Sequence, residues 1–150
     1  MMGHHKIAQA IQEQWQVAFG LRVQLQNKEW KVFLDELNHG DFQIARMGGI
    51  ASFPDPITFL NEYRYSGGHQ FARWHNSEYS ALLDKADYCP DNQKRKEFLL
   101  AAEQILIDEM PIIPIYYYTG NYLQNPRLKN VHVSEMNDID FKLSYLEETP

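Results

Sequence analysis

Apolar side chains recur every three or four residues over residues 6–19, at Ile7, Ala8, Ile11, Trp15 and Ala18. This spacing aligns them on one face of a helix, and Gly20 is the residue type that commonly ends one. Residues 22–26 then alternate between polar and apolar side chains. Strict alternation predicts a strand, because successive side chains of a strand point to opposite faces.

The order of helix and strand is then repeated. Asn27 is a suitable cap for a second helix, and Gly40 a suitable end for it. The apolar face of this helix carries Trp30, Phe33, Leu34 and Leu37. Residues 42–46 alternate again and predict a second strand. This order favours a right-handed crossover, with the two strands parallel and adjacent.

Beyond these strands the pattern becomes mostly helical and then weakens. Residues 48–56 (GGIASFPDP) predict a loop, in which two glycines permit unusual backbone conformations and two prolines stiffen the exit. The elements expected next are a short helix over 57–63, a turn-rich stretch over 65–75, a helix capped by Ser77 and reaching Tyr88, a helix capped by Asp91 and reaching Asp108, a strand over 111–118, and short strands and loops over 121–146.

Composition excludes several classes of protein. Of the 150 residues 44% are hydrophobic, which excludes a disordered chain, and no apolar run approaches the roughly 18 residues that cross a bilayer. The single cysteine excludes an internal disulfide framework and a cysteine-based metal site. The net charge is −6, and the acidic excess lies in the second half of the chain. Because no basic face is left to neutralise phosphates, nucleic acid is not expected as a partner.

Patterns typical of catalysis are also absent. Cys89 lies between Asp87 and Asp91, and neighbouring carboxylates disfavour the reactive thiolate. Ser52 lacks the G-x-S-x-G frame of a nucleophile elbow, so a hydrolase acting at this loop is a remote alternative. We therefore predict no catalytic residue.

Metal and cofactor motifs are missing as well. The candidate metal ligands are His69, His75 and Glu78. They show no ordered ligand spacing, and the chain has no phosphate-binding or dinucleotide-binding glycine motif. We predict no metal site and no cofactor.

The stretch most indicative of function begins at Arg46 and continues through Gly48 and Gly49. An arginine at the end of a parallel strand would face the crevice where open α/β sheets bind ligands, and its guanidinium can hold a carboxylate with two hydrogen bonds. Glycine backbone beside it can pair with an extended peptide. An ion pair between Arg46 and a local acid, Asp35 or Asp41, is an equally weighted alternative.

Aromatic residues offer a similar choice between core and pocket. The residues concerned are Trp30, Phe53, Trp74 and the run Tyr116–Tyr118. Taken one at a time, each is better explained as a core residue. On a strand, Tyr116 and Tyr118 would share a face that Tyr117 opposes. One of these two faces would be partly polar, because buried tyrosine hydroxyls need partners.

Four segments in order resemble a known family. They are Glu29–Asp35, Asp41–Gly48, Ser77–Tyr79 with Leu82 and Leu83, and Ala102–Leu106 continuing through Pro111–Tyr118. This order is similar to the C-terminal part of the oligopeptide-binding proteins of bacterial ABC importers, the extracellular solute-binding protein family 5. The resemblance implies an α/β fold: a periplasmic-binding-protein-like lobe, with a mixed sheet and helices on both faces. It also implies a partial type II solute-binding fold, because family members are longer and close two lobes on the ligand.

The resemblance carries further expectations about function. Such proteins are not enzymes, and they capture oligopeptides outside the cytoplasmic membrane and deliver them to a permease. Residue by residue, Arg46 matches an arginine that can meet a ligand carboxylate, and Gly48, Gly49 and Ile50 match the loop that pairs with the peptide backbone. Trp30 matches an aromatic lining a side-chain pocket. Tyr118 matches a tyrosine that faces the cleft.

Two positions depart from the family pattern. Ser52 replaces an aspartate that usually pairs with the ligand's α-ammonium, and the nearby acid Asp55 is an alternative partner for that ammonium. Gly49 replaces a bulky aromatic, which implies a wider pocket. The same scaffold binding a different solute is therefore an open alternative.

The ends of the chain suggest a boundary. Residues 1–5 resemble tag or vector residues, and residues 6–150 a fragment of the C-terminal ligand-binding lobe. No signal segment is visible, so a periplasmic or cell-envelope location is expected only of a full-length parent. Membrane contact would then come through the permease or a lipid anchor.

Overall fold

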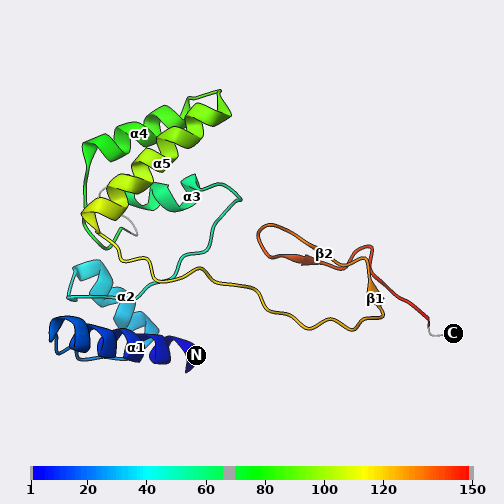
Figure 1. The fold of residues 1–150 in the computed structure, drawn as a ribbon, viewed down its shortest axis with the longest axis horizontal. Helices are drawn as coiled ribbons and strands as arrows, with labels where there is room; N and C mark the ends of the chain where they lie inside the picture. The colour runs from blue at the N-terminus through cyan, green and yellow to red at the C-terminus, as the bar shows by residue number, and fades with distance from the viewer. Residues whose placement is uncertain (1, 66–69, 149–150) are drawn as a thin grey trace. The chain divides into compact units, whose positions relative to one another are not determined.

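The computed structural model describes residues 2–65 and 70–148. The chain divides into two units, Met1–Ala45 and Arg46–Pro150 (Figure 1). Each unit has its own helices.

The first unit contains two helices, α1 (Met2–Phe19) and α2 (Trp30–His39). Both end as expected, because Gly20 and Gly40 adopt positive φ angles of 69° and 79°, a conformation that glycine takes without strain. The start of α2 differs from the prediction. Glu29, not Asn27, is its cap, and Glu29 Oε2 accepts hydrogen bonds from the backbone N–H groups of Lys31 at 2.8 Å and Val32 at 3.3 Å.

The two strands predicted in this part of the chain are not formed. Residues 22–26 and 42–46 have no ladder partner, so the predicted parallel pair is wrong for the described structure. Alternating side chains satisfy only the faces of a strand, and its backbone still needs a neighbouring strand to hydrogen-bond with. One carbonyl, that of Val23, instead accepts a hydrogen bond from the side-chain amide of Gln12 at 2.6 Å.

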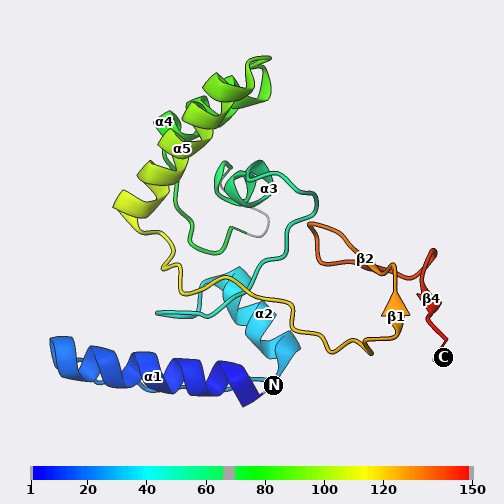
Figure 2. The ribbon, with the colours of Figure 1, turned by 45° about the vertical axis from the view of Figure 1, so that its right-hand side comes forward.

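The second unit is built around α4 (Ser77–Asp87) and α5 (Asn92–Glu109), which lie side by side and antiparallel (Figure 1, Figure 2). Before them come α3 (Ile57–Leu60) and the 3-10 helix η1 (Asn61–Tyr63), together the short helix predicted over 57–63. The buried core that these helices share consists of Ile57, Leu60, Tyr79, Leu83, Ala86, Leu99, Ala102 and Leu106.

The caps of the long helices follow the sequence closely. Asp91 caps α5 as predicted, and its Oδ1 accepts from the N–H groups of Gln93 at 2.9 Å and Lys94 at 3.1 Å. The cap of α4 is Asn76, one residue before the predicted Ser77, and its side chain accepts from the N–H of Tyr79 at 2.9 Å. Either side chain suits a cap, so the sequence pattern alone did not separate these neighbours.

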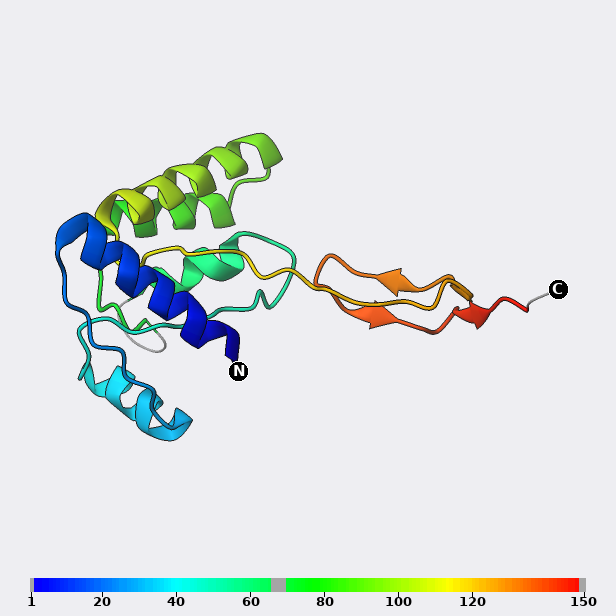
Figure 3. The same ribbon diagram turned by 60° about the horizontal axis from the view of Figure 1, so that its bottom comes forward.

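Beyond α5 the chain is extended but unpaired. The strand predicted over residues 111–118 is not formed. Four short strands follow: β1 (Leu128–Lys129), β2 (His132–Val133), β3 (Ile139–Asp140) and β4 (Tyr145–Leu146). They make two antiparallel ladders, β1 with β4 and β2 with β3, as the orange and red part of the ribbon shows (Figure 3). The described residues thus contain small antiparallel sheets, not the broad mixed sheet expected.

None of the helices among the described residues is long and apolar enough to cross a membrane.

Candidate ligand-binding site

The loop 48–56 starts beside a contact between two residues far apart in the sequence. The guanidinium of Arg46 donates a hydrogen bond from Nη2 to the hydroxyl of Tyr118. Gly48 lies against this pair, because a Cβ added at Gly48 would stand 3.4 Å from Tyr118 Oη and 3.6 Å from Arg46 Nη2. The structure therefore brings together three of the residues that the sequence assigned to ligand binding.

The next loop residues leave their backbone open to solvent. Gly49 is exposed, and its nearest neighbours belong to the helices that follow: an added Cβ would stand 3.7 Å from Phe59 Cε1 and 4.0 Å from Glu62 Oε1. Ile50 is 88% exposed. Backbone N–H and C=O groups in such a loop are available to an extended ligand.

The tyrosine run surrounds the same arginine. The rings of Tyr116 and Tyr118 meet edge to face with centroids 4.9 Å apart, while Tyr117 is 92% exposed. The predicted shared face of Tyr116 and Tyr118 is confirmed, although the segment is not a paired strand. Both tyrosines are also solvent-accessible, so the core interpretation is wrong for this run.

Hydrogen bonding within this cluster shifts the pKa values of Tyr116 and Tyr118 in opposite directions. The hydrogen bond from Tyr116, followed by that from Arg46, lowers the pKa of Tyr118. The hydrogen bond to Tyr118, with some desolvation, raises the pKa of Tyr116. The cause is that the Tyr118 oxygen accepts hydrogen bonds and is stabilised as a phenolate, whereas Tyr116 must keep its proton to donate.

This arrangement predicts the order of tyrosine ionisation. As the pH rises, Tyr118 should lose its proton at a lower pH than an ordinary tyrosine, and before Tyr116. Arg46→Gln should raise the pKa of Tyr118, because it removes the positive charge that favours the phenolate. Carbon chemical shifts of labelled tyrosine rings, followed against pH, give both values. Arg127→Gln, which alters an arginine bound to the Glu147 carbonyl, is the matched control. An unchanged Tyr118 titration in Arg46→Gln would contradict the arrangement.

Ser52 is also on the exposed loop, and it is held there by a hydrogen bond of its backbone. Its backbone N–H donates to Thr58 Oγ1 at 3.1 Å, which ties the middle of the loop to α3. Among the described residues, no histidine or carboxylate accepts a hydrogen bond from the Ser52 hydroxyl. The site residue is therefore at the surface, without the base that a nucleophile requires.

Asp55 is occupied within the protein. Its carboxylate accepts hydrogen bonds from both terminal nitrogens of Arg95, at 2.8 Å and 3.0 Å, and from the N–H of Ile57 at 2.9 Å. The hydrogen bonds from Arg95 hold the pKa of Asp55 below its ordinary value, against a smaller opposing effect of burial. The idea that Asp55 replaces the missing acid for a ligand ammonium is thus not supported.

The remaining aromatic residues divide between core and surface. Trp74 packs on the core of the second unit, meets Tyr79 edge to face at 4.9 Å, and donates from Nε1 to Glu109 at 2.6 Å. Phe53 is 47% exposed. In the first unit, Trp30 at the start of α2 is 58% exposed and stands 5.9 Å from Phe33, so the core interpretation is wrong for Trp30.

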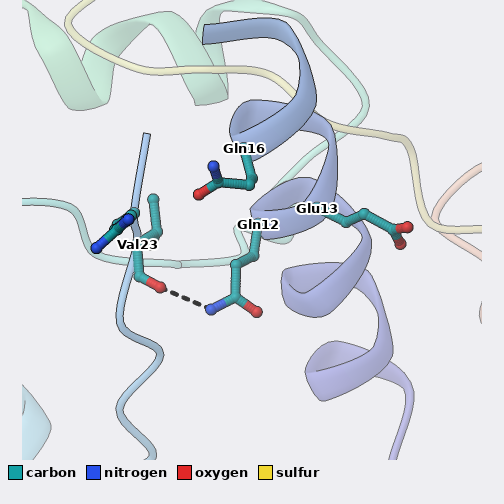
Figure 4. Close-up of a pocket in the computed structure, with 5 residues that line it drawn as sticks. Gln12, Glu13, Gln16 and Val23 are labelled. Carbon is teal, nitrogen blue, oxygen red and sulfur yellow. Dashed lines mark hydrogen bonds between the residues drawn. The ribbon is translucent and has the colours of Figure 1, made fainter. Parts of the chain in front are cut away.

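Sequence reasoning missed two residues of the cluster around the loop. They are Thr58 and Arg95. Alternation in the tyrosine run pointed to Tyr116, but no local signal marks Arg95, which meets Asp55 across forty positions. Sequence reasoning also missed a pocket in the first unit, which is lined by Gln12, Glu13, Gln16, Arg22 and Val23 (Figure 4).

The structure offers little to a metal ion. Within residues 2–65 and 70–148 there is no group of three histidine, cysteine or carboxylate side chains that could hold one. One candidate ligand, His69, lies outside the described residues, as do Gly67 and Gly68 of the turn-rich stretch.

Comparison with known proteins explains why these segments occur in this order. Residues 2–71 match the family model described as bacterial extracellular solute-binding proteins, family 5 Middle. The oligopeptide-binding protein OppA of Bacillus subtilis is 43% identical over 145 residues, which are 96% of this chain and 27% of the relative. This chain belongs with the family 5 solute-binding proteins. It spans about a quarter of the length of the curated relatives that it matches.

Other members of the family extend the comparison. The probable deoxycholate-binding periplasmic protein YgiS of Escherichia coli is 34% identical over 134 residues, covering 83% of this chain and 25% of the relative. The solved structure of the Escherichia coli murein tripeptide binding protein MppA superposes with a TM-score of 0.76 at 36% identity, covering 84% of this chain and 25% of that one. The α/β solute-binding fold expected from the sequence is therefore confirmed.

Proposed function

We propose that this chain forms part of the ligand-binding wall of the substrate-binding component of a peptide ABC importer, which captures oligopeptides between two lobes for delivery to a permease. The observation that carries the proposal is the contact of Arg46 with Tyr118 directly beside Gly48, next to exposed loop backbone. The relatives named for peptide binding support the choice of ligand.

Each part of the site has a role in this proposal. Arg46 receives a ligand carboxylate with charge-assisted hydrogen bonds. Gly48, Gly49 and Ile50 pair with the ligand backbone, which gives affinity that does not depend on side-chain identity. Trp30 lines a side-chain pocket, and Tyr118 faces the cleft. Residues 6–150 act as part of one lobe, in the periplasm or cell envelope, and the protein binds without catalysing a reaction.

A second solute class has its own support. Ser52 supplies no charge for a ligand ammonium, and Asp55 is already paired with Arg95. A relative that covers 83% of this chain is named for deoxycholate, which has a carboxylate but no amine. The alternative is therefore the same scaffold holding a non-peptide carboxylate at Arg46. A hydrolase at Ser52 has no comparable support, because no described base hydrogen-bonds to its hydroxyl.

A chimera tests the proposal. This chain replaces the 145 matching residues of the Bacillus subtilis relative, so that the site is completed by the rest of a binding protein. Calorimetric titrations then compare a free peptide, its N-acetylated form and deoxycholate. We expect the two peptides to bind with similar affinity, because Ser52 recognises no ammonium. Arg46→Ala should weaken peptide binding by about 10-fold or more, since hydrogen bonds to charged groups contribute about 1.5–3 kcal/mol.

Controls keep the experiment decisive. Arg127→Ala removes an arginine outside the loop and should change the affinity by less than about threefold. Circular dichroism establishes that each chimera is folded. A folded chimera that binds deoxycholate but no peptide would favour the second solute class, and one that binds neither would overturn the proposal. The 150 residues alone should bind peptide weakly or not at all, because only part of the cleft wall is present.

A further inference from the structure

The loop 48–56 contains no helix or strand, yet it must hold its backbone in place to pair with a ligand. A loop that is disordered before binding would lose affinity through the ordering of each residue. The contacts that restrain it are therefore as important as the residues that meet the ligand.

The strongest of these contacts is made by Asp55, near the end of the loop. Arg95 Nη1 donates to Asp55 Oδ2 at 2.8 Å, and Arg95 Nη2 donates to Asp55 Oδ1 at 3.0 Å. Asp55 Oδ1 also accepts from the N–H of Ile57 at the start of α3. Two parallel hydrogen bonds between a guanidinium and a carboxylate fix the orientation of both groups. The two side chains are 28% and 26% exposed, so solvent screens the pair only in part.

Both ends of this pair are tied to the same core. Arg95 lies in the first turns of α5, whose buried residues Leu99, Ala102 and Leu106 pack in the core. Ile57, two residues after Asp55, is buried in that core as well. The ion pair therefore joins the packed helices α4 and α5 to the loop that carries Gly48, Gly49 and Ile50.

We propose that Asp55 and Arg95 are positioning residues, which hold the loop 48–53 in its binding conformation without contacting the ligand. This inference rests on the proposed function for its effect on affinity. Its structural part, the order of the loop, stands independently of which ligand binds. It also assigns Asp55 a role other than ammonium recognition.

Loop order is measured in the 150-residue chain itself. Asp55→Asn removes the ion pair but keeps an oxygen for the Ile57 N–H, and Arg95→Met removes it from the other side. Backbone amide order parameters of Gly49 and Ile50 should fall from about 0.85 to below about 0.6 in both variants, while those of Leu99 and Ala102 stay unchanged. Low values in the unaltered chain, or no change on substitution, would overturn the inference.

Affinity is measured in the chimera described above. Asp55→Asn and Arg95→Met should each weaken peptide binding by about 10-fold, equally for free and N-acetylated peptides. The double variant should be no weaker than either single one, because both remove the same interaction. Glu147→Gln, which removes the exposed Lys129–Glu147 pair, should leave affinity within about twofold.

The possible outcomes separate the two hypotheses. If Asp55→Asn weakens only the free-amine peptide and Arg95→Met does not weaken it, Asp55 contacts the ligand and the positioning role is wrong. Additive losses in the double variant would also contradict it. If the unsubstituted chimera binds no ligand while loop order still depends on the pair, the proposed function fails and the positioning role remains.

Discussion

Leu83→Ala should lower the free energy of unfolding of the second unit, which is built around α4 and α5, by about 3–5 kcal/mol. Leu83 is completely buried, and it lies in the cluster that joins α3, α4 and α5. Truncating it loses the transfer free energy of the side chain and leaves a cavity that close-packed neighbours fill only partly. Because small domains are stable by only about 5–15 kcal/mol, this single change should remove a large share of the stability.

This loss is measured by unfolding in urea, with amide hydrogen exchange at Leu99 and Ala102 as the probe. Both residues lie in the second unit, so the probe reports on the unit that contains Leu83. Leu100→Ala is the matched control, because it truncates the same side chain on the exposed face of α5, where Leu100 is 52% exposed. Its effect should stay within about 0.5 kcal/mol. Equal losses in the two variants would show that Leu83 does not belong to the core described here.

Helices were the part of the fold that local sequence could predict. Gly20 and Gly40 end α1 and α2 because their positive φ angles suit glycine, and Asp91 starts α5 because its carboxylate reaches two free N–H groups. Each of these signals acts within a few residues. The error at α2 has the same origin: Glu29 and Asn27 are both plausible caps, and only the structure distinguishes them.

Strands were predicted less well, because a strand depends on a partner elsewhere. Residues 22–26, 42–46 and 111–118 have suitable side-chain patterns, but no described segment pairs with them. A ladder requires both of its strands, and side-chain alternation in one segment does not identify the second. The short pairs β1–β4 and β2–β3 are the ladders of the described residues.

In the candidate site, too, local sequence predicted some features, whereas contacts between residues far apart in the sequence were not predicted. The exposed glycine loop and the shared face of Tyr116 and Tyr118 follow from local pattern. Resemblance to a family marked Arg46 and Tyr118 separately as site residues, but their contact, which spans 72 positions, was not predicted. Arg95 lies on a helix whose local sequence gives no reason to pair it with Asp55. Long-range ion pairs of this kind are set by packing.

Arg64 gives the second large effect, because it is a charge held almost entirely inside the protein. Its side chain is only 8% exposed. Its guanidinium donates to Asp84, to Asp87 at 2.6 Å and to Asn61 at 3.1 Å, and it lies 5.3 Å from the ring centroid of Tyr65. These contacts tie the end of η1 to α4, and they give the two terminal nitrogens partners in place of water, while the buried Nε has no hydrogen-bond partner among the described residues.

The informative prediction is which substitution among Arg64, Asp84 and Asp87 lowers the stability most. Replacing Asp84 and Asp87 together by alanine should lower the free energy of unfolding by about 3–5 kcal/mol, because it leaves a buried cation without its counter-charges. Arg64→Met should cost less, about 1–2 kcal/mol, because it fills the space with an apolar side chain and leaves the acids, which are 60% and 37% exposed, able to meet water.

Denaturant unfolding of the three proteins, unaltered, Arg64→Met and the double-alanine variant, measures this order directly. Adding Arg64→Met to the double-alanine variant should recover stability, since the unpaired cation is then removed. That recovery separates a buried-charge penalty from a simple loss of contacts, which would make the triple variant the least stable of all. A triple variant less stable than the double one would therefore contradict the account, because it would mean that solvent reaches Arg64 and that its charge needs no partner.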